Sequence, residues 1–163
     1  MDYKKTNINF LHEDLIKEHG KELGNKFYAA ACKKYTSLCE NESKSENVVM
    51  NDHIFNRFLP AVSLYFSLIE NNFSKEEALE FTLKETQRNA QYLAKKNEGL
   101  TKMPFSYGMF KMFSKSHMKK NYPIEGFTVE WKQLDKKEVH FDITRCIYKD
   151  MCEKYGCPQL SCI

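Results

Sequence analysis

The sequence has 163 residues, of which 42% are hydrophobic, 13% aromatic and 29% charged. This length suits one compact core, and the apolar fraction is too high for a disordered chain. The 25 basic and 22 acidic residues are spread along the sequence, which excludes the concentrated positive field of a nucleic-acid-binding protein. No run reaches about 18 apolar residues, so we expect no membrane span or signal peptide, and a cytoplasmic single domain over residues 1–163.

The first half of the sequence predicts helices. Apolar residues recur near the helical period over 10–39, with a bend expected near Gly20 and Gly24, and the polar segment 40–47 predicts a loop. Residues 58–69 are apolar on nearly every side, which is typical of a helix buried in the middle of a domain. Pro60 is expected to start or kink that helix.

Two further helices are predicted in the central part of the chain. SKEE at 74–77 is a capping-box pattern, which predicts a helix running to about Lys95. A fourth helix is predicted over 105–122. The residues expected to face inward from that helix are Met109, Phe110 and Phe113.

The hydrophobic period then changes from helical to two, which predicts an antiparallel hairpin. The alternating apolar residues are Phe127, Val129, Trp131, Val139, Phe141 and Ile143. Strict alternation would place on the opposite face His140, Asp142, Thr144 and Cys146. A last helix is expected from Ile147 to Gly156. The prediction is therefore an α+β fold, with four to five helices packed on a small antiparallel hairpin near the C-terminus.

Six cysteines in a reducing compartment are expected to be free thiols, metal ligands or catalytic groups. Four lie near the end of the sequence, at Cys146, Cys152, Cys157 and Cys162. Their separations of five, four and four residues differ from the paired knuckles of zinc ribbons. We therefore expect no metal or other cofactor, with zinc or iron bound through these four thiols as the alternative.

Cys146 is the candidate nucleophile, because it follows Arg145 at an expected strand-to-helix junction and would share a face with His140 and Asp142. A small buried hydrophobic residue beside a solvated hairpin face is the alternative explanation. Two polar residues, His53 and Asn56, open the apolar helix. They are candidates for substrate binding, and a helix cap or a satisfied polar pair explains them equally well.

Two segments together resemble a known family. FLPAVSLYFSLIENNFSKEEAL (58–79) followed by FDITRCIYKDMCEKYGCPQL (141–160) resembles the L-2-amino-thiazoline-4-carboxylic acid hydrolase family, from about residue 50 onward. Family members commonly carry Glu where this chain has Gln159, and they usually continue beyond Ile163. From this resemblance, and because a lone hairpin is marginal in water, we expect the sequence to be truncated at its C-terminus relative to the family.

The resemblance implies a hydrolase that opens a cyclic C–N bond of a small thiazoline carboxylate on the way to cysteine. Arg145 would hold the carboxylate, and attack would come from Cys146 or from water deprotonated by His140 or His53. One alternative is a non-catalytic sensor that binds a small ligand or a metal through its thiols. Another is a truncated partner in a homo-oligomer. The expected partners exclude nucleic acid and membranes.

Overall fold

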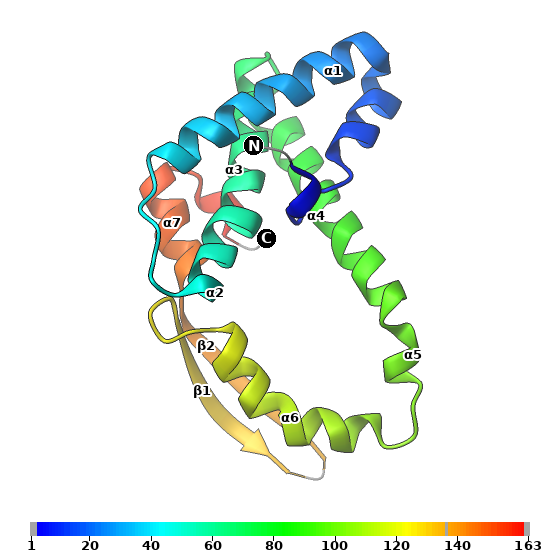
Figure 1. The fold of residues 1–163 in the computed structure, drawn as a ribbon, viewed down its shortest axis with the longest axis vertical. Coiled ribbons are helices and arrows are strands. Elements are labelled where there is room, and N and C mark those ends of the chain that lie inside the picture. The colour runs from blue at the N-terminus through cyan, green and yellow to red at the C-terminus, as the bar shows by residue number, and fades with distance from the viewer. Residues whose placement is uncertain (1–2, 136, 162–163) are drawn as a thin grey trace.

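The computed structural model describes residues 3–135 and 137–161. Its helices are η1 (Tyr3–Lys5), α1 (Leu11–Glu40), α2 (Val48–Asn51), η2 (Asp52–Phe58), α3 (Leu59–Glu70), α4 (Lys75–Lys96), α5 (Glu98–Thr101), α6 (Ser106–Asn121), α7 (Ile147–Tyr155) and η3 (Pro158–Leu160). Strands β1 (Phe127–Leu134) and β2 (Val139–Cys146) form an antiparallel hairpin. The predicted α+β class is confirmed (Figure 1).

Helix α3 is the centre of the core. Leu59, Val62 and Leu64 are fully buried, and both α1 and α4 pack against α3. The prediction of an all-round apolar helix is therefore confirmed. Burial of each such side chain contributes about 1.5–3 kcal/mol, so α3 fixes the positions of the two longest helices.

Helix α1 bends where the sequence predicts it. Gly20 has φ 80° and ψ 165°, which interrupts the helical backbone, and residues with a side chain rarely adopt this conformation. The two halves of α1 approach closely at Gly24. A Cβ atom there would lie 2.6 Å from the Cα of Ile16 and 2.7 Å from the carbonyl oxygen of Leu15. Only glycine fits this approach without a backbone shift.

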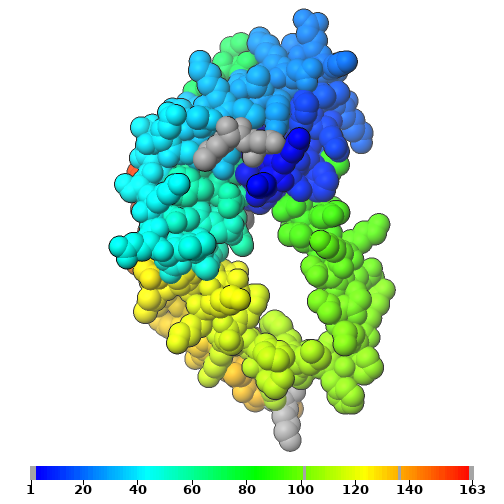
Figure 2. Space-filling view, in the orientation of Figure 1, coloured from blue at the N-terminus to red at the C-terminus, as the bar shows by residue number. Residues whose placement is uncertain are grey.

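Helix α4 extends beyond the core. Its predicted capping box is present, because the Ser74 hydroxyl accepts from the Glu77 amide and the Glu77 carboxylate accepts from the Ser74 amide. Residues 91–100 are all exposed. Figure 2 shows an opening framed by the helical body on one side and by the far end of α4, α5 and α6 on the other.

Helix α6 differs from the prediction. Met109, Phe110 and Phe113 were expected to face inward, but they are 46%, 56% and 53% exposed. The residues that α6 buries are Ser114 and Met118. The helix has apolar residues around most of its circumference, and a spacing argument cannot decide which of them meets a partner.

The hairpin register corrects a second prediction. Phe127 pairs with Cys146 and Val129 pairs with Ile143, so the register shifts by one residue at Thr144. Residues directly opposite each other in an antiparallel pair share a face. Cys146 therefore lies on the face of Phe127, and not on the face of Asp142 as strict alternation predicted. The extra residue in β2 is a β-bulge, which changes the phase of the strand.

Glu85 is a buried carboxylic acid in α4. Its side chain is 1% exposed, and neither carboxyl oxygen has a hydrogen-bond partner in the part of the chain that the structure describes. Burial raises the pKa of Glu85 to about 7, against a smaller opposing effect of Lys84. The neutral acid is therefore the form that the folded protein favours at mildly acidic pH.

We expect Gly24→Ala to lower the free energy of unfolding by about 2 kcal/mol, because overpacking costs roughly 1–3 kcal/mol. Gly99→Ala is the matched control, since no atom lies within 4 Å of the position that a Cβ would take there and alanine favours the helix. Urea denaturation measures both. If both substitutions changed the free energy of unfolding by the same amount, the close backbone approach at Gly24 would not require glycine.

We expect Glu85→Gln to gain about 3 kcal/mol in stability relative to the wild type between pH 4.5 and pH 8. The folded pKa of about 7 exceeds the ordinary value of 4.5. The unfolded chain therefore releases this proton first, and the wild type loses stability as pH rises from about 4.5 to 7. Chemical denaturation across this range measures the effect. Glu80→Gln, at an exposed position of the same helix, should show no such trend.

Candidate functional site

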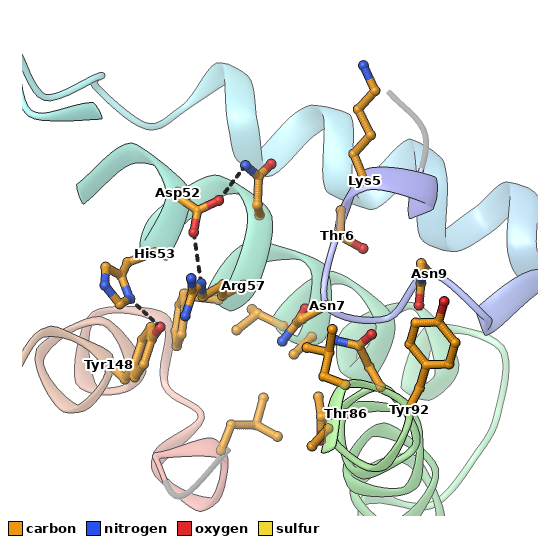
Figure 3. A pocket seen from close by; sticks show the side chains of 18 of the residues that line it. Lys5, Thr6, Asn7, Asn9, Asp52, His53, Arg57, Thr86, Tyr92 and Tyr148 are labelled. Carbon is orange, nitrogen blue, oxygen red and sulfur yellow. Dashed lines mark hydrogen bonds and ion pairs between the residues drawn. The ribbon is translucent and has the colours of Figure 1, made fainter. Parts of the chain in front are cut away.

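A cavity of about 620 Å³ lies where the N-terminal segment, η2, α4 and α7 meet (Figure 3). This volume suits a small organic ligand. Its lining includes the cations Lys4, Lys5 and Arg57 and one anion, Asp52. The excess of positive charge favours a ligand that carries a carboxylate or another anionic group.

The π-helical turn η2 builds one wall of this cavity. Asp52 accepts hydrogen bonds from Asn56 Nδ2 at 3.0 Å and from Arg57 Nε at 2.8 Å. A π-helical turn brings residues five apart into register, and such turns occur frequently at functional sites. Burial works to raise the pKa of Asp52, but the bonds from Asn56 and Arg57 outweigh it and hold the pKa below its usual value. Asp52 is thus an anion that orients Arg57.

Arg57 is the accessible cation of the site. Its side chain is 48% exposed, and only Nε is used by Asp52. The described residues give its two terminal guanidinium nitrogens no hydrogen-bond partner. A guanidinium in this state can bind a carboxylate through two parallel hydrogen bonds.

A buried histidine, His53, and a half-buried tyrosine, Tyr148, form a hydrogen-bonded pair beside Arg57. His53 is 1% exposed, and its Nε2 lies 2.6 Å from the carbonyl oxygen of Asn121. Because a carbonyl only accepts, Nε2 carries the proton. Nδ1 of the neutral ring then accepts from the Tyr148 hydroxyl at 2.6 Å.

The protonation states of this pair follow from burial. Burial lowers the pKa of His53, and the hydrogen bond to Asn121 offsets this only in part. Burial raises the pKa of Tyr148 well above its usual value, against the opposing effect of Arg57. Both groups are therefore neutral near pH 7, and the hydrogen bond between them is a path along which a proton can move from the phenol to the imidazole.

The residues predicted from the sequence fall into two places. His53 and Asn56 line the cavity. His140 and Asp142 lie 3.5 Å apart on the exposed face of the hairpin, and Arg145 forms an exposed ion pair with Asp150 at 3.3 Å. These three do not line the cavity.

Cys146 lies in the chain between the exposed hairpin face and helix α7. It is half-buried at the position that precedes α7, and it is close enough to Tyr148 to influence that residue electrostatically. It does not line the cavity. A catalytic role for Cys146, His140 or Asp142 stays a prediction.

The four cysteines considered as metal ligands are only partly described. Cys152 and Cys157 are buried together in the core, and Cys162 lies outside the described residues. Within residues 3–135 and 137–161, no group of three or more His, Cys, Asp or Glu side chains is arranged to hold a metal ion. The same residues contain no helix that is both long and apolar enough to cross a membrane.

Sequence reasoning missed the site residues Asp52, Arg57 and Tyr148. The sequence did contain a signal for Arg57, because it is a single cation directly before a completely apolar helix. A charged residue in that position is expected to lie at the edge of the hydrophobic core. Tyr148 gave no signal, because one tyrosine in an amphipathic helix is ordinary. The π-helical period of η2 also could not be read from its sequence.

Comparisons with known proteins give one match. The family model described as L-2-amino-thiazoline-4-carboxylic acid hydrolase matches residues 51–163. Neither curated proteins nor solved structures give a match. The matched region contains η2, the helices α3 to α7 and the hairpin, and therefore most of the cavity wall. The chain belongs to the L-2-amino-thiazoline-4-carboxylic acid hydrolase family.

Proposed function

We propose that the protein hydrolyses the ring of a small thiazoline carboxylate, such as 2-amino-thiazoline-4-carboxylate, bound in this cavity. The observation that carries this proposal is the position of Arg57, with two unpaired terminal nitrogens, beside the neutral His53–Tyr148 pair in one cavity. Family membership supports the reaction class. A carboxylate anchor and a proton-transfer pair are the two functions that this hydrolysis needs.

Arg57 binds the substrate carboxylate in this proposal. Its Nε bond to Asp52 at 2.8 Å fixes the plane of the guanidinium, and the terminal nitrogens then present a fork of the right geometry. Lys4 and Lys5 lie at the edge of the same cavity, and the Lys5 side chain extends away from it (Figure 3). Arg145, the anchor expected from the sequence, is instead paired with Asp150.

The His53–Tyr148 pair transfers the proton. Water adds to the ring carbon that lies between nitrogen and sulfur, and it gives a proton to the Tyr148 oxygen as the phenol proton passes to His53 Nδ1. The proton then returns through Tyr148 to the ring heteroatom that leaves, so the pair ends in its starting state. The lowered pKa of His53 keeps the imidazole unprotonated and able to accept.

A non-covalent mechanism of this kind differs from attack by Cys146. In the covalent alternative, the Cys146 thiolate adds to the same ring carbon and water later releases the enzyme. The Cys146 side chain is close enough to Tyr148 to raise the pKa of that phenol, but Cys146 does not line the cavity. The two mechanisms predict opposite effects of substitutions at these two residues.

We expect Arg57→Ala to reduce kcat/KM by at least about tenfold, mainly through KM, because a charged hydrogen bond contributes about 1.5–3 kcal/mol. Arg57→Lys should recover only part of the loss, since lysine cannot form the bidentate contact. Arg145→Ala is the matched control and should change kcat/KM by less than about threefold, as its ion pair is exposed. Mass spectrometry of the product with one added water follows turnover. A larger effect at Arg145 would contradict the assignment.

We expect Tyr148→Phe to lower kcat by at least about 100-fold, because it removes the proton path. Cys146→Ser should retain most of the activity. The wild type should keep its activity at pH 6.5, the usual pKa of histidine, and lose it only at lower pH, because burial lowers the pKa of His53 and protonated His53 cannot accept a proton. Thiol titration of the product shows whether the C–S or the C–N bond opens. Full loss in Cys146→Ser with activity kept in Tyr148→Phe would replace this mechanism by the covalent one.

A further inference from the structure

Strand β2 has an outer edge that can accept a further strand. Within the described part of the chain, β1 and β2 form a sheet of two strands, and this hairpin lies at the opposite end of the molecule from α1 (Figure 1). Helix α6 approaches β1, since Lys115 Nζ is 5.6 Å from the ring centre of Trp131 and both residues line one groove. Among residues 3–135 and 137–161, no backbone group of β2 bonds to a segment outside the hairpin. The outer edge of β2 is therefore available for pairing.

This edge lacks the usual protection against pairing with another chain. Proteins commonly protect a free edge with lysine, proline or a bulge. Residues 139–143 have the sequence VHFDI, without lysine, proline or glycine, and the β-bulge lies just beyond them at Thr144. Ile143 is 41% exposed, so its side chain has contact area left for a neighbour. Because a hairpin alone is marginal in water, a further strand would stabilise this one.

We propose that β2 pairs antiparallel with β2 of a second copy of the chain, with Phe141 opposite its own copy at the two-fold axis. In this register Val139 lies opposite Ile143 of the second copy, and His140 lies opposite Asp142. Residues directly opposite each other share a face of the sheet. The apolar pairs therefore meet on one face and the charged pairs on the other. Each pair occurs twice, as a two-fold interface requires.

The charges of β2 favour this register over its neighbours. His140 Nε2 and Asp142 Oδ1 lie 3.5 Å apart within one strand, and the two-fold axis gives each of them a second neighbour of complementary character. A shift by one residue would place Asp142 opposite the apolar Val139. A shift by two would place Asp142 opposite itself or opposite Glu138, and like charges directly opposite each other are destabilising. The strand is therefore complementary to itself in one register.

Helix α6 is the other exposed apolar surface, but it does not suit a second copy. Residues 106–121 contain four lysines and no acidic residue. Face-to-face packing of two such helices would bring like charges together. The edge of β2 has no such excess of one sign, because His140 and Arg145 are accompanied by Asp142. The charge pattern thus favours the strand edge as the surface for self-association.

Sedimentation velocity of the whole chain in reducing buffer should show a reversible dimer of the 19.3 kDa chain at about 100 µM. Ile143→Lys should weaken dimerisation at least about tenfold, because a lysine on a strand edge opposes pairing. Ile124→Lys is the matched control, since Ile124 is 81% exposed and precedes β1, and it should dimerise as the wild type does. A wild type that stays monomeric, or equal effects of the two substitutions, would overturn the proposal.

A mixing experiment tests the register itself. His140→Asp would create two acidic pairs across the axis and Asp142→Lys two basic ones, so each variant alone should dimerise at least about tenfold more weakly than the wild type. In a mixed dimer of the two variants, both charged pairs again join opposite signs, and dimerisation should return to about the wild-type strength. Changes within one chain cannot produce this recovery.

Thermal melting verifies that the substituted chains fold. If Ile143→Lys does not fold, the mixing experiment replaces it, because recovery on mixing requires two folded chains. A mixture that associates no more tightly than either charge variant alone would overturn the proposal. Assemblies larger than a dimer would overturn it too, since pairing about a two-fold axis uses the β2 edge of both copies and closes.

Discussion

The placement of α6, the hairpin and α7 against the helical body depends on the two hydrogen bonds of His53. The imidazole lies in the buried turn η2, and its nitrogens bind the carbonyl oxygen of Asn121, at the end of α6, and the hydroxyl of Tyr148 in α7, both at 2.6 Å. The ring of Phe127, the first residue of the hairpin, packs on it at 4.8 Å. One side chain thereby joins the helical body to α6, to the hairpin and to α7. Removing either bond would leave a polar group buried without a partner, which costs about 1–3 kcal/mol.

The same bonds determine the chemistry that the cavity can support. Because Asn121 accepts from Nε2, the imidazole has only Nδ1 available as an acceptor, and Tyr148 fills it. The adjacent widened turn lets Asp52 hold Arg57 from five residues away. The structural constraint and the proposed catalytic arrangement thus share the same groups. Substitutions in η2 should therefore affect stability and activity together, unlike substitutions at the exposed ion pair of Arg145.

Local rules were sufficient for much of the fold. The capping box at Ser74, the break at Gly20 and the left-handed cap at Gly156, with φ 65°, each follow from one residue type and its immediate neighbours. Alternation predicted the two strands but not the bulge at Thr144, because an inserted residue leaves the composition of a strand unchanged. Because of this bulge, Cys146 lies on the opposite face of the hairpin from Asp142. The strand alternation had predicted that Cys146, His140 and Asp142 share one face, and they do not.

The sequence by itself determined the helical segments, the hairpin, the all-apolar centre and the family, because these depend on periodicity, capping and motif content along the chain. Only the tertiary structure decided which polar residues meet. Asn7, Arg57 and Tyr148 lie far apart in the sequence, in the turn before α1, in η2 and in α7, yet they line one cavity. The physical reason is that the cavity forms where the N-terminal segment, η2, α4 and α7 pack together, and contacts between separate segments leave no regular spacing in the sequence.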